Sequence, residues 1–397
     1  MFLDAPSWRR AWDAGTYCLG VGKTTGACYY GAMNTPKKVF VAATRQNDGK
    51  TMVSLGLFQA FKKRYDRVGY MKPVGQQYRL VEGQKIDKDA VLFGNVYQLH
   101  DRRMDMSPIA VSRGFTESFI DQPDTHWIGD QIDDALRRLQ ADKSLILFEG
   151  TGHAGVGSVF DMSNADVAQR VGAKVVLVAP GGIGKCIDEI MLNKACFDMR
   201  GVSLAGVIIN KVEPDKYDKI SEYVHRGLSR HGIPVLGVIP FVKLLIRPTV
   251  AELYEEFGAE LLSGHANLNQ SVGHFVIGDM RPHDALDYFR GDTLLICPAN
   301  REELVMTALC SSILDPDGSH DVAAIVFTSG IRPHEKMMDL IRSSRIPMMM
   351  VQEDSFSVAT KINRMLFKIH AEESQKIEKI QSLIEDHVDV DRLCQQL

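Results

Sequence analysis

Gly49, Lys50 and Thr51 end a segment whose residue types and spacing are typical of a phosphate-binding loop. The segment reads Thr44-Arg45-Gln46-Asn47-Asp48-Gly49-Lys50-Thr51, and the general pattern has glycine at the position of Thr44. Backbone N–H groups and a helix N-terminus would face an anion there. Lys50 would reach the outer phosphates and the Thr51 hydroxyl would bind Mg²⁺. We therefore predict a nucleotide site, with a plain turn and a solvated lysine as the alternative.

Three further charged residues stand where strands end or a helix begins. Lys72 follows an apolar run at 67–71, and Asp89 lies in the first turn of a helix that opens at 86–93. Ligands collect at the carboxyl ends of parallel strands, so Lys72 is a candidate anion contact; a surface lysine is the alternative. Asp89 either helps to hold Mg²⁺ or only complements the helix dipole.

Glu149 ends the apolar run 145–149 and is followed by a glycine-rich loop. We predict that Glu149 binds the metal ion and that Gly150 and Gly152 let the backbone approach phosphate. A helix N-cap is the alternative for Glu149. His153 either touches substrate or faces solvent.

The elements that must position these residues alternate between strand and helix. The run before the loop, 39–43, is a buried strand, and a helical spacing follows it to residues 62–64. Residues 97–126 look irregular, either as a substrate-side insertion or as a long connection. The turn at 180–185 either lines the cleft or only joins strand to helix. Further buried strands are predicted at 174–179, 204–212 and 235–240, with helices near 127–140, 164–171 and 186–197. This alternation predicts an α/β fold with a doubly wound parallel sheet.

Length and composition limit the function classes. At 397 residues the chain is long enough for two domains, and 45% hydrophobic with 24% charged residues is ordinary for a globular protein. A net charge of −4 gives no electrostatic case for nucleic acid, and no apolar run reaches the length of a membrane span. The seven cysteines are scattered without a C-x-x-C pair, which argues against zinc and favours a cytoplasmic location.

A second Gly-Lys-Thr string lies near the N-terminus, at 20–25. No apolar strand precedes it and a poor helix start follows, so we predict that it does not bind phosphate. Met33 stands shortly before the first predicted strand and could be the natural first residue of the chain. Residues 1–37 are therefore predicted to be a disordered extension, or residues 1–32 an upstream mis-assigned start.

Together these motifs resemble the P-loop family of dethiobiotin synthetase and the cobyrinic acid amidases, over residues 38–245. The same domain forms the N-terminal, non-catalytic part of long phosphate acetyltransferases. The resemblance implies ATP and Mg²⁺ as cofactors, catalytic roles for Lys50 and Lys72, and recognition of adenine by Asn210. The positions that it implies for the nucleotide are Thr44, Asn47, Asp48, Gly49, Lys50, Thr51, Gly150, Gly152, Asn210 and Pro240, and those for the metal are Thr51, Asp89 and Glu149.

The resemblance does not extend to the biotin substrate. Dethiobiotin synthetase has a serine-glycine pair after its lysine-proline strand end, where this chain has Gly75-Gln76-Gln77. The loop after Glu149 is closer to the version found in acetyltransferases.

Residues 246–360 read as a smaller α/β domain. Strands are predicted at 275–278, 293–298, 323–328 and 347–351, with helices at 282–290, 302–312 and 333–344. Their order resembles the DRTGG domain, which accompanies the same P-loop domain in phosphate acetyltransferases and occurs in some kinase regulators. Of its naming motif, only Arg301 and an acid survive here.

An amphipathic C-terminal helix is predicted for 361–397. Such a helix packs on its own domain or, alternatively, forms a dimer. A long phosphate acetyltransferase would continue into a catalytic domain, so we expect no acetyl transfer from this chain.

The function expected from all this is a nucleotide-dependent metabolic regulator. It would bind a small-molecule effector, report to a partner enzyme and, by analogy with the family, form a homodimer. The alternative is an ATP-dependent ligase that phosphorylates a small carboxylate or carbamate. A pure scaffold is the third possibility.

Overall fold

The computed structural model describes residues 35–314, 322–365 and 369–397. The string at 20–25 and residues 1–34 of the predicted extension lie outside these ranges. The predicted boundary at residue 37 was wrong by one residue, because Lys37 begins the first strand.

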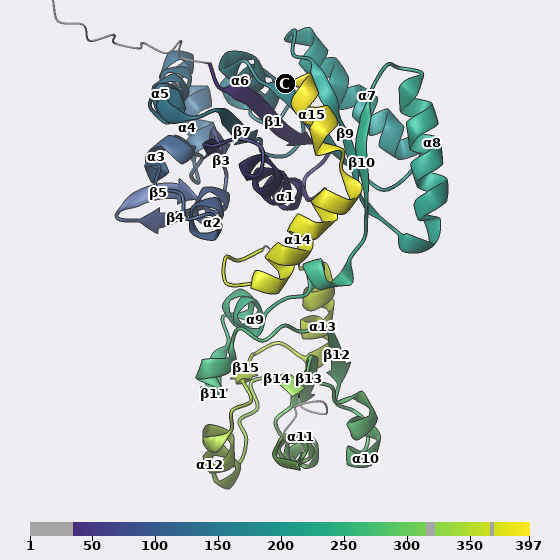
Figure 1. Cartoon of the computed structure of the whole chain (residues 1–397). Coiled ribbons are helices and arrows are strands. Elements are labelled where there is room, and N and C mark those ends of the chain that lie inside the picture. The colour runs from purple at the N-terminus through teal and green to yellow at the C-terminus, as the bar shows by residue number, and fades with distance from the viewer. Residues whose placement is uncertain (1–34, 315–321, 366–368) are drawn as a thin grey trace, which may run out of the picture. The chain divides into compact units, whose positions relative to one another are not determined.

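The first domain is built on a six-stranded parallel sheet with the order β10-β9-β8-β1-β7-β2 (Figure 1). The strands are β1 (Lys37–Ala43), β2 (Val68–Met71), β7 (Leu145–Glu149), β8 (Lys174–Pro180), β9 (Leu204–Val212) and β10 (Val235–Pro240). Each of them coincides with an apolar run in the sequence. The predicted parallel sheet is confirmed.

The central strand β1 shows why these runs become strands. Successive side chains of a strand point to opposite faces. Val39 and Val41 pack in the core on one face of the sheet, and Phe40 and Ala42 pack in the core on the other face. A strand buried on both faces has to be apolar throughout.

Helices cover both faces of this sheet. One core contains side chains of α5 (Thr125–Leu139), α6 (Asn164–Val171), α7 (Gly184–Met199) and α8 (Tyr217–Ser229). The other contains side chains of α1 (Lys50–Lys62), α2 (Lys88–Val96), α14 (Ser374–His387) and α15 (Val390–Gln396). The last two helices come from the C-terminal end of the chain, so the first domain is discontinuous in sequence.

Short elements fill the segment between β2 and α5. They are β3 (Val74–Gly75), the hairpin of β4 (Tyr78–Val81) and β5 (Gln84–Asp87), α3 (Arg103–Met106), β6 (Ile109–Ala110) and α4 (Phe115–Asp121). The expectation that 97–126 would be irregular was therefore wrong in part, because α3, β6 and α4 lie within it.

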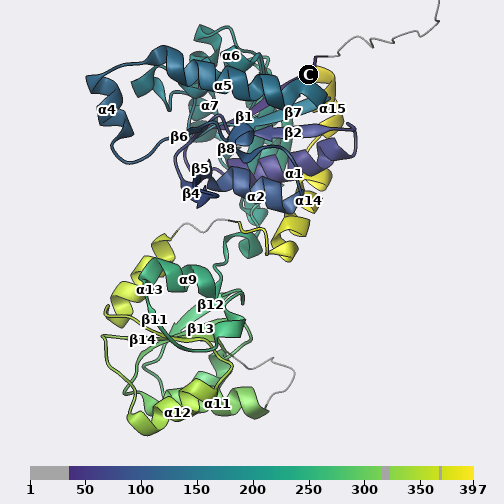
Figure 2. The same cartoon turned by 90° about the vertical axis from the view of Figure 1, so that its left-hand side faces the viewer.

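The second domain has a five-stranded sheet with the order β11-β15-β14-β13-β12. Its strands are β11 (Glu260–Ser263), β12 (His274–Ile277), β13 (Thr293–Pro298), β14 (Val322–Thr328) and β15 (Met348–Met350), of which β11 is antiparallel to β15. Side chains of α10 (Pro282–Ala285), α11 (Glu302–Leu314) and α12 (Glu335–Ser343) pack on one face, and those of α9 (Val250–Phe257) and α13 (Ser355–Arg364) on the other (Figure 2). The smaller α/β domain is confirmed, with β11 as the strand that the sequence did not reveal.

The predicted single C-terminal helix is two helices, α14 and α15. Val388 lies between them and forms an antiparallel bridge with Gly237 of β10. This bridge holds the break in the helix against the edge of the first sheet.

Within the described ranges, no helix combines the length and the apolar composition needed to cross a membrane.

Candidate functional site

The loop between β1 and α1 is held in shape by Asp48. Its Oδ2 accepts hydrogen bonds from the Thr44 hydroxyl and from Arg45 N, both at 2.8 Å. Thr44 therefore has a structural use at a position where the general pattern has glycine. Burial raises the pKa of Asp48, while these hydrogen bonds oppose that shift.

The N-terminus of α1 is arranged as an anion site. Gly49 precedes the helix with a φ of 93°, a left-handed conformation that favours glycine. Because glycine has no side chain that could cap the helix, the first N–H groups of α1 can bind an external anion. Lys50 and Thr51 form the first turn of this helix.

Two residues at the end of β9 support the loop from the other side. Asn210 Nδ2 donates to Asp48 O at 2.9 Å, and Lys211 Nζ donates to Asn47 O at 2.8 Å. A Cβ on Gly49 would lie 2.3 Å from Asn210 Nδ2, so the two are in close contact. Asn210 is buried and fixes the backbone of the loop, a role that the sequence did not predict.

We predict that Asn210→Ala weakens ATP and GTP binding equally, by about 5-fold. The substitution removes one hydrogen bond to the loop, and a bond of this kind contributes about 1 kcal/mol. Titration with both nucleotides measures the effect. A loss for ATP much larger than the loss for GTP would instead support the adenine contact implied by the family resemblance.

Lys72, Asp89 and Glu149 meet in a buried cluster beside the loop. Lys72 Nζ donates to Asp89 Oδ2 and lies 3.4 Å from Glu149 Oε1. Glu149 also accepts hydrogen bonds from Thr51 Oγ1 at 2.8 Å and from Tyr70 OH at 3.2 Å. The structure thus brings together the three predicted metal-binding residues and the second predicted catalytic lysine.

Burial and charge oppose each other in this cluster. Burial alone would lower the pKa of Lys72, but the carboxylates of Asp89 and Glu149 outweigh it and raise that pKa above its usual value. Burial raises the pKa of Glu149, against the charge of Lys72. Tyr70 has a strongly raised pKa, because it is buried and faces Glu149. Its phenol therefore stays protonated and acts as a donor.

Lys50 has the opposite shift. Burial lowers its pKa from 10.5 to about 8, with Glu149 opposing the shift and Lys72 adding to it. Between pH 8 and 10.5 the unfolded chain holds a proton here that the folded chain has lost. The contribution of Lys50 to folding stability therefore rises with pH across this window.

We predict that ATP affinity falls above pH 8, by up to about 10-fold per pH unit, because phosphate binding requires the charged form of Lys50. Binding at pH 8.5 should be coupled to proton uptake, measurable by calorimetry in two buffers of different ionisation enthalpy. Lys50→Arg is the control, since a guanidinium stays charged throughout. A flat wild-type profile from pH 7 to 9.5 would contradict this prediction.

In the loop after Glu149, Gly150 packs against protein side chains, whereas we had expected it to let the backbone approach phosphate. A Cβ on Gly150 would lie 2.7 Å from Asn164 Oδ1 and 2.8 Å from Phe40 Cε1, so this glycine makes room for protein side chains. Asn164 bonds to Thr151 N and to the carbonyls of Thr151 and His153. This role of Asn164 was not predicted from the sequence. His153 is exposed.

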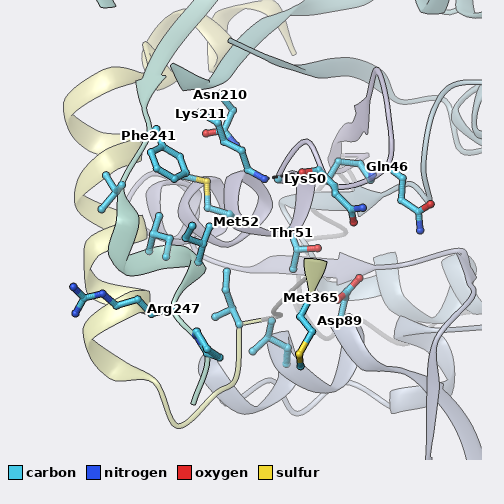
Figure 3. A pocket seen from close by; sticks show the side chains of 18 of the residues that line it. Gln46, Lys50, Thr51, Met52, Asp89, Asn210, Lys211, Phe241, Arg247 and Met365 are labelled. Carbon is cyan, nitrogen blue, oxygen red and sulfur yellow. Dashed lines mark hydrogen bonds between the residues drawn. The ribbon is translucent and has the colours of Figure 1, made fainter. Parts of the chain in front are cut away.

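A cavity of about 770 Å³ opens over the loop, a size usual for small-molecule sites (Figure 3). The predicted residues that line it are Asn47, Gly49, Lys50, Thr51, Lys72, Asp89, Glu149, Gly152, Asn210 and Pro240. Thr44, Asp48 and Gly150 lie behind this wall and shape it. Gln46, Met52 and Phe241 also line the cavity and were not predicted. Phe241 directly follows the end of β10. Ligands collect at the carboxyl ends of parallel strands, so this position in the sequence could have indicated that Phe241 lines the site.

Within the described ranges, no group of three or more His, Cys, Asp or Glu side chains is arranged to hold a metal ion. Asp89 and Glu149 instead share the ammonium of Lys72.

Comparisons with known proteins identify the families to which the two domains are similar. Residues 37–249 match the AAA domain family and residues 252–365 match the DRTGG domain. Phosphate acetyltransferase of Nitratidesulfovibrio vulgaris is 24% identical over 368 residues, covering 90% of this chain and 51% of that protein. ATP-dependent dethiobiotin synthetase BioD of Aromatoleum aromaticum is 27% identical over 221 residues, covering 53% of this chain and 93% of that protein. Both resemblances seen in the sequence are confirmed.

The chain spans about half the length of the curated phosphate acetyltransferases that it matches. Among solved structures, the MinC:MinD cell division protein complex of Aquifex aeolicus covers 53% of this chain and 84% of the matched chain, with 13% identity and a TM-score of 0.34. A likeness at this TM-score supports no conclusion about function.

Proposed function

Because the chain belongs to the AAA domain family and carries a DRTGG domain after it, we propose that it is a nucleotide-dependent regulator that binds ATP with Mg²⁺ at the loop 44–51. The observation that carries the ATP part is the loop itself. Lys50 and Thr51 begin a helix whose N-terminus opens into a cavity of about 770 Å³. Lys50 would bind the outer phosphates, and the backbone held by Asp48 and Asn210 would enclose them.

The donor set suits a magnesium ion. Thr51, Asp89 and Glu149 offer only oxygen atoms, and Mg²⁺ is usually bound by one or two carboxylates plus water and phosphate oxygens. Asp89 and Glu149 are both buried beside the loop and already contact a cation there, the ammonium of Lys72. When bound, the magnesium ion would neutralise phosphate charge.

The regulatory part rests on two features. The residues that follow Lys72 are Gly75-Gln76-Gln77, where the biotin enzyme has its serine-glycine pair, and Gln76 and Gln77 line the cavity. The second domain matches the DRTGG domain, and the resemblance described above implies that this domain occurs in some kinase regulators. We propose that the nucleotide and a small-molecule effector act together on a partner enzyme, in the cytoplasm and with the chain as a homodimer.

The buried cluster favours one alternative function, an ATP-dependent ligase. Lys50 and Lys72 both line the cavity, so both could stabilise charge on a phosphoryl group during its transfer to a small carboxylate or carbamate. The similarity to a dethiobiotin synthetase over 53% of the chain supports this reading. No protein nucleophile would be needed.

Calorimetric titration with ATP and Mg²⁺ tests the proposal. Lys50→Ala should bind ATP about 10- to 100-fold more weakly, the loss expected for a hydrogen bond between charged groups. Lys219→Ala, an exposed lysine on α8, is the matched control and should bind like the wild type. Unchanged binding in Lys50→Ala would reject the loop as the nucleotide site.

A phosphate-release assay on the same samples separates regulator from ligase. A regulator releases no phosphate in response to added carboxylates. Phosphate release that depends on a small carboxylate would establish the ligase instead.

A further inference from the structure

The Lys72 ammonium is surrounded by three buried carboxylates. Besides its contacts with Asp89 and Glu149, Lys72 Nζ lies 3.8 Å from Asp87 Oδ1. Asp87 is itself fixed as the N-cap of α2, where its side chain accepts a hydrogen bond from Asp89 N at 2.9 Å. Lys72 therefore brings one positive charge into contact with all three carboxylates.

Glu149 and Asp89, the carboxylates proposed to bind the metal, lie on rigid supports. Glu149 ends the interior strand β7 and is held by Thr51 and Tyr70. Asp89 lies in the first turn of α2. Lys72, by contrast, reaches the cluster on a flexible four-carbon stem from the end of β2. The lysine can leave while both carboxylates stay in place.

A divalent cation and an ammonium group compete for these oxygens. Two positive charges a few ångströms apart repel strongly in a buried, low-dielectric site. A carboxylate oxygen that accepts a hydrogen bond from Lys72 also presents fewer lone pairs to a metal ion.

We propose that Lys72 is the resident counter-ion of Asp89 and Glu149, and that it has to release them before they can hold a divalent cation. This inference rests on the ATP and Mg²⁺ site proposed above. It makes metal binding depend on the nucleotide, because phosphate groups offer the Lys72 ammonium a new anionic partner. Lys72 is thus a positioning residue that keeps the site closed to free metal ions.

Mn²⁺ binding to the nucleotide-free protein tests this inference, with the free ion measured by electron paramagnetic resonance. Lys72→Met removes the charge and keeps most of the side-chain length. It should bind Mn²⁺ at least 10-fold more tightly than the wild type does. Lys219→Met is the control, because Lys219 is exposed on α8 and does not line the cavity. It should bind Mn²⁺ like the wild type.

Thermal melting of the same samples gives a second readout. Lys72→Met removes the ammonium group that these carboxylates contact, so its melting temperature should fall in metal-free buffer and recover when Mn²⁺ is added. A purely structural role for Lys72 would produce the fall without the recovery. If Lys72→Met does not melt cooperatively, Lys72→Gln, whose amide can still donate to Asp89, takes its place.

Two results would overturn the inference. One is a wild-type chain that binds Mn²⁺ without nucleotide as tightly as Lys72→Met does. The other is a folded Lys72→Met or Lys72→Gln chain with no gain in Mn²⁺ affinity. Because these titrations contain no nucleotide, their outcome is separate from the ATP titration of the wild type. A wild type that fails to bind ATP would reject the proposed function and leave the Mn²⁺ result readable.

Discussion

A fragment of residues 36–249, which ends where the match to the AAA domain family ends, will not form a stable domain. The missing piece is the C-terminal pair of helices, α14 and α15. Five of their side chains, with Val388 between the two helices, belong to the core on one face of the first sheet, namely Ile380, Leu383, Ile384, Val388, Val390 and Leu393. Without them, that face of the sheet and one side of α1 are exposed to water.

The expected loss is comparable with the total stability of a domain. Burial of an aliphatic side chain contributes about 1.5–3 kcal/mol, so six of them contribute on the order of 10 kcal/mol. Domains are stable by only about 5–15 kcal/mol in total. Polar contacts add to the loss, because Asp389 N donates to Leu236 O at 2.7 Å and Arg64 Nε donates to Asp391 Oδ1 at 2.7 Å.

Circular dichroism melting and ATP titration measure this effect. Residues 36–249 alone should melt without a cooperative transition and should not bind ATP. The control is the same fragment joined to residues 372–397 by a long flexible linker, which should recover both properties. Cooperative melting of residues 36–249 within a few degrees of the whole chain would contradict the prediction.

The sequence allowed the first sheet to be predicted because its strands are buried on both faces. Such strands appear as unbroken apolar runs, as at Leu145–Glu149 and Leu204–Val212. The hairpin of β4 and β5 was missed for the converse reason. Most of β4 faces solvent, and Leu80 is 71% exposed. Its sequence therefore lacks the alternation of apolar and polar residues that indicates a half-buried strand.

The site was predictable where a residue type is tied to a chain position. Lys50, Thr51 and Glu149 stand at a helix start or a strand end, and they line one cavity as expected. The contact of Asn210 with Asp48 O joins residues 162 positions apart, and nothing in the local pattern of either residue indicates it. Such contacts depend on the final packing of β9 against the loop.

The C-terminal helices show the same limit. Their helical spacing was evident, but the surface that they cover was not, because it lies more than 300 residues earlier in the chain. One signal was available. The sequence of α1, KTMVSLGLFQAFK, places apolar residues around most of the helix, which is typical of a helix covered by more than one neighbour. The sheet alone could not provide that cover.

Gly56→Ala will destabilise the chain by about 2 kcal/mol, although alanine is the better helix former by about 1 kcal/mol. Gly56 lies in the middle of α1, beneath α14. A Cβ there would lie 2.1 Å from Ile384 Cγ1, 2.8 Å from Ile384 Cβ and 3.1 Å from Ile380 O. A rotation of the Ile384 side chain cannot relieve the last two contacts, so α14 itself has to move away. Lys50 and Thr51 begin the same helix, so ATP affinity should fall as well.

A double-mutant cycle with Ile384→Ala identifies the cause. Ile384→Ala alone leaves a cavity and should cost about 2–5 kcal/mol. If the clash is the reason for the glycine, Gly56→Ala should cost at least about 1 kcal/mol less in the Ile384→Ala background than in the wild type. Gly184→Ala, at the start of α7, is the matched control, because a Cβ there meets nothing within 4 Å. Urea unfolding of the four chains of the cycle and the control gives these differences. Additive losses in the cycle would mean that Gly56 is not needed for the close approach of α14. The contact between α1 and α14 would then not constrain the start of the phosphate-loop helix.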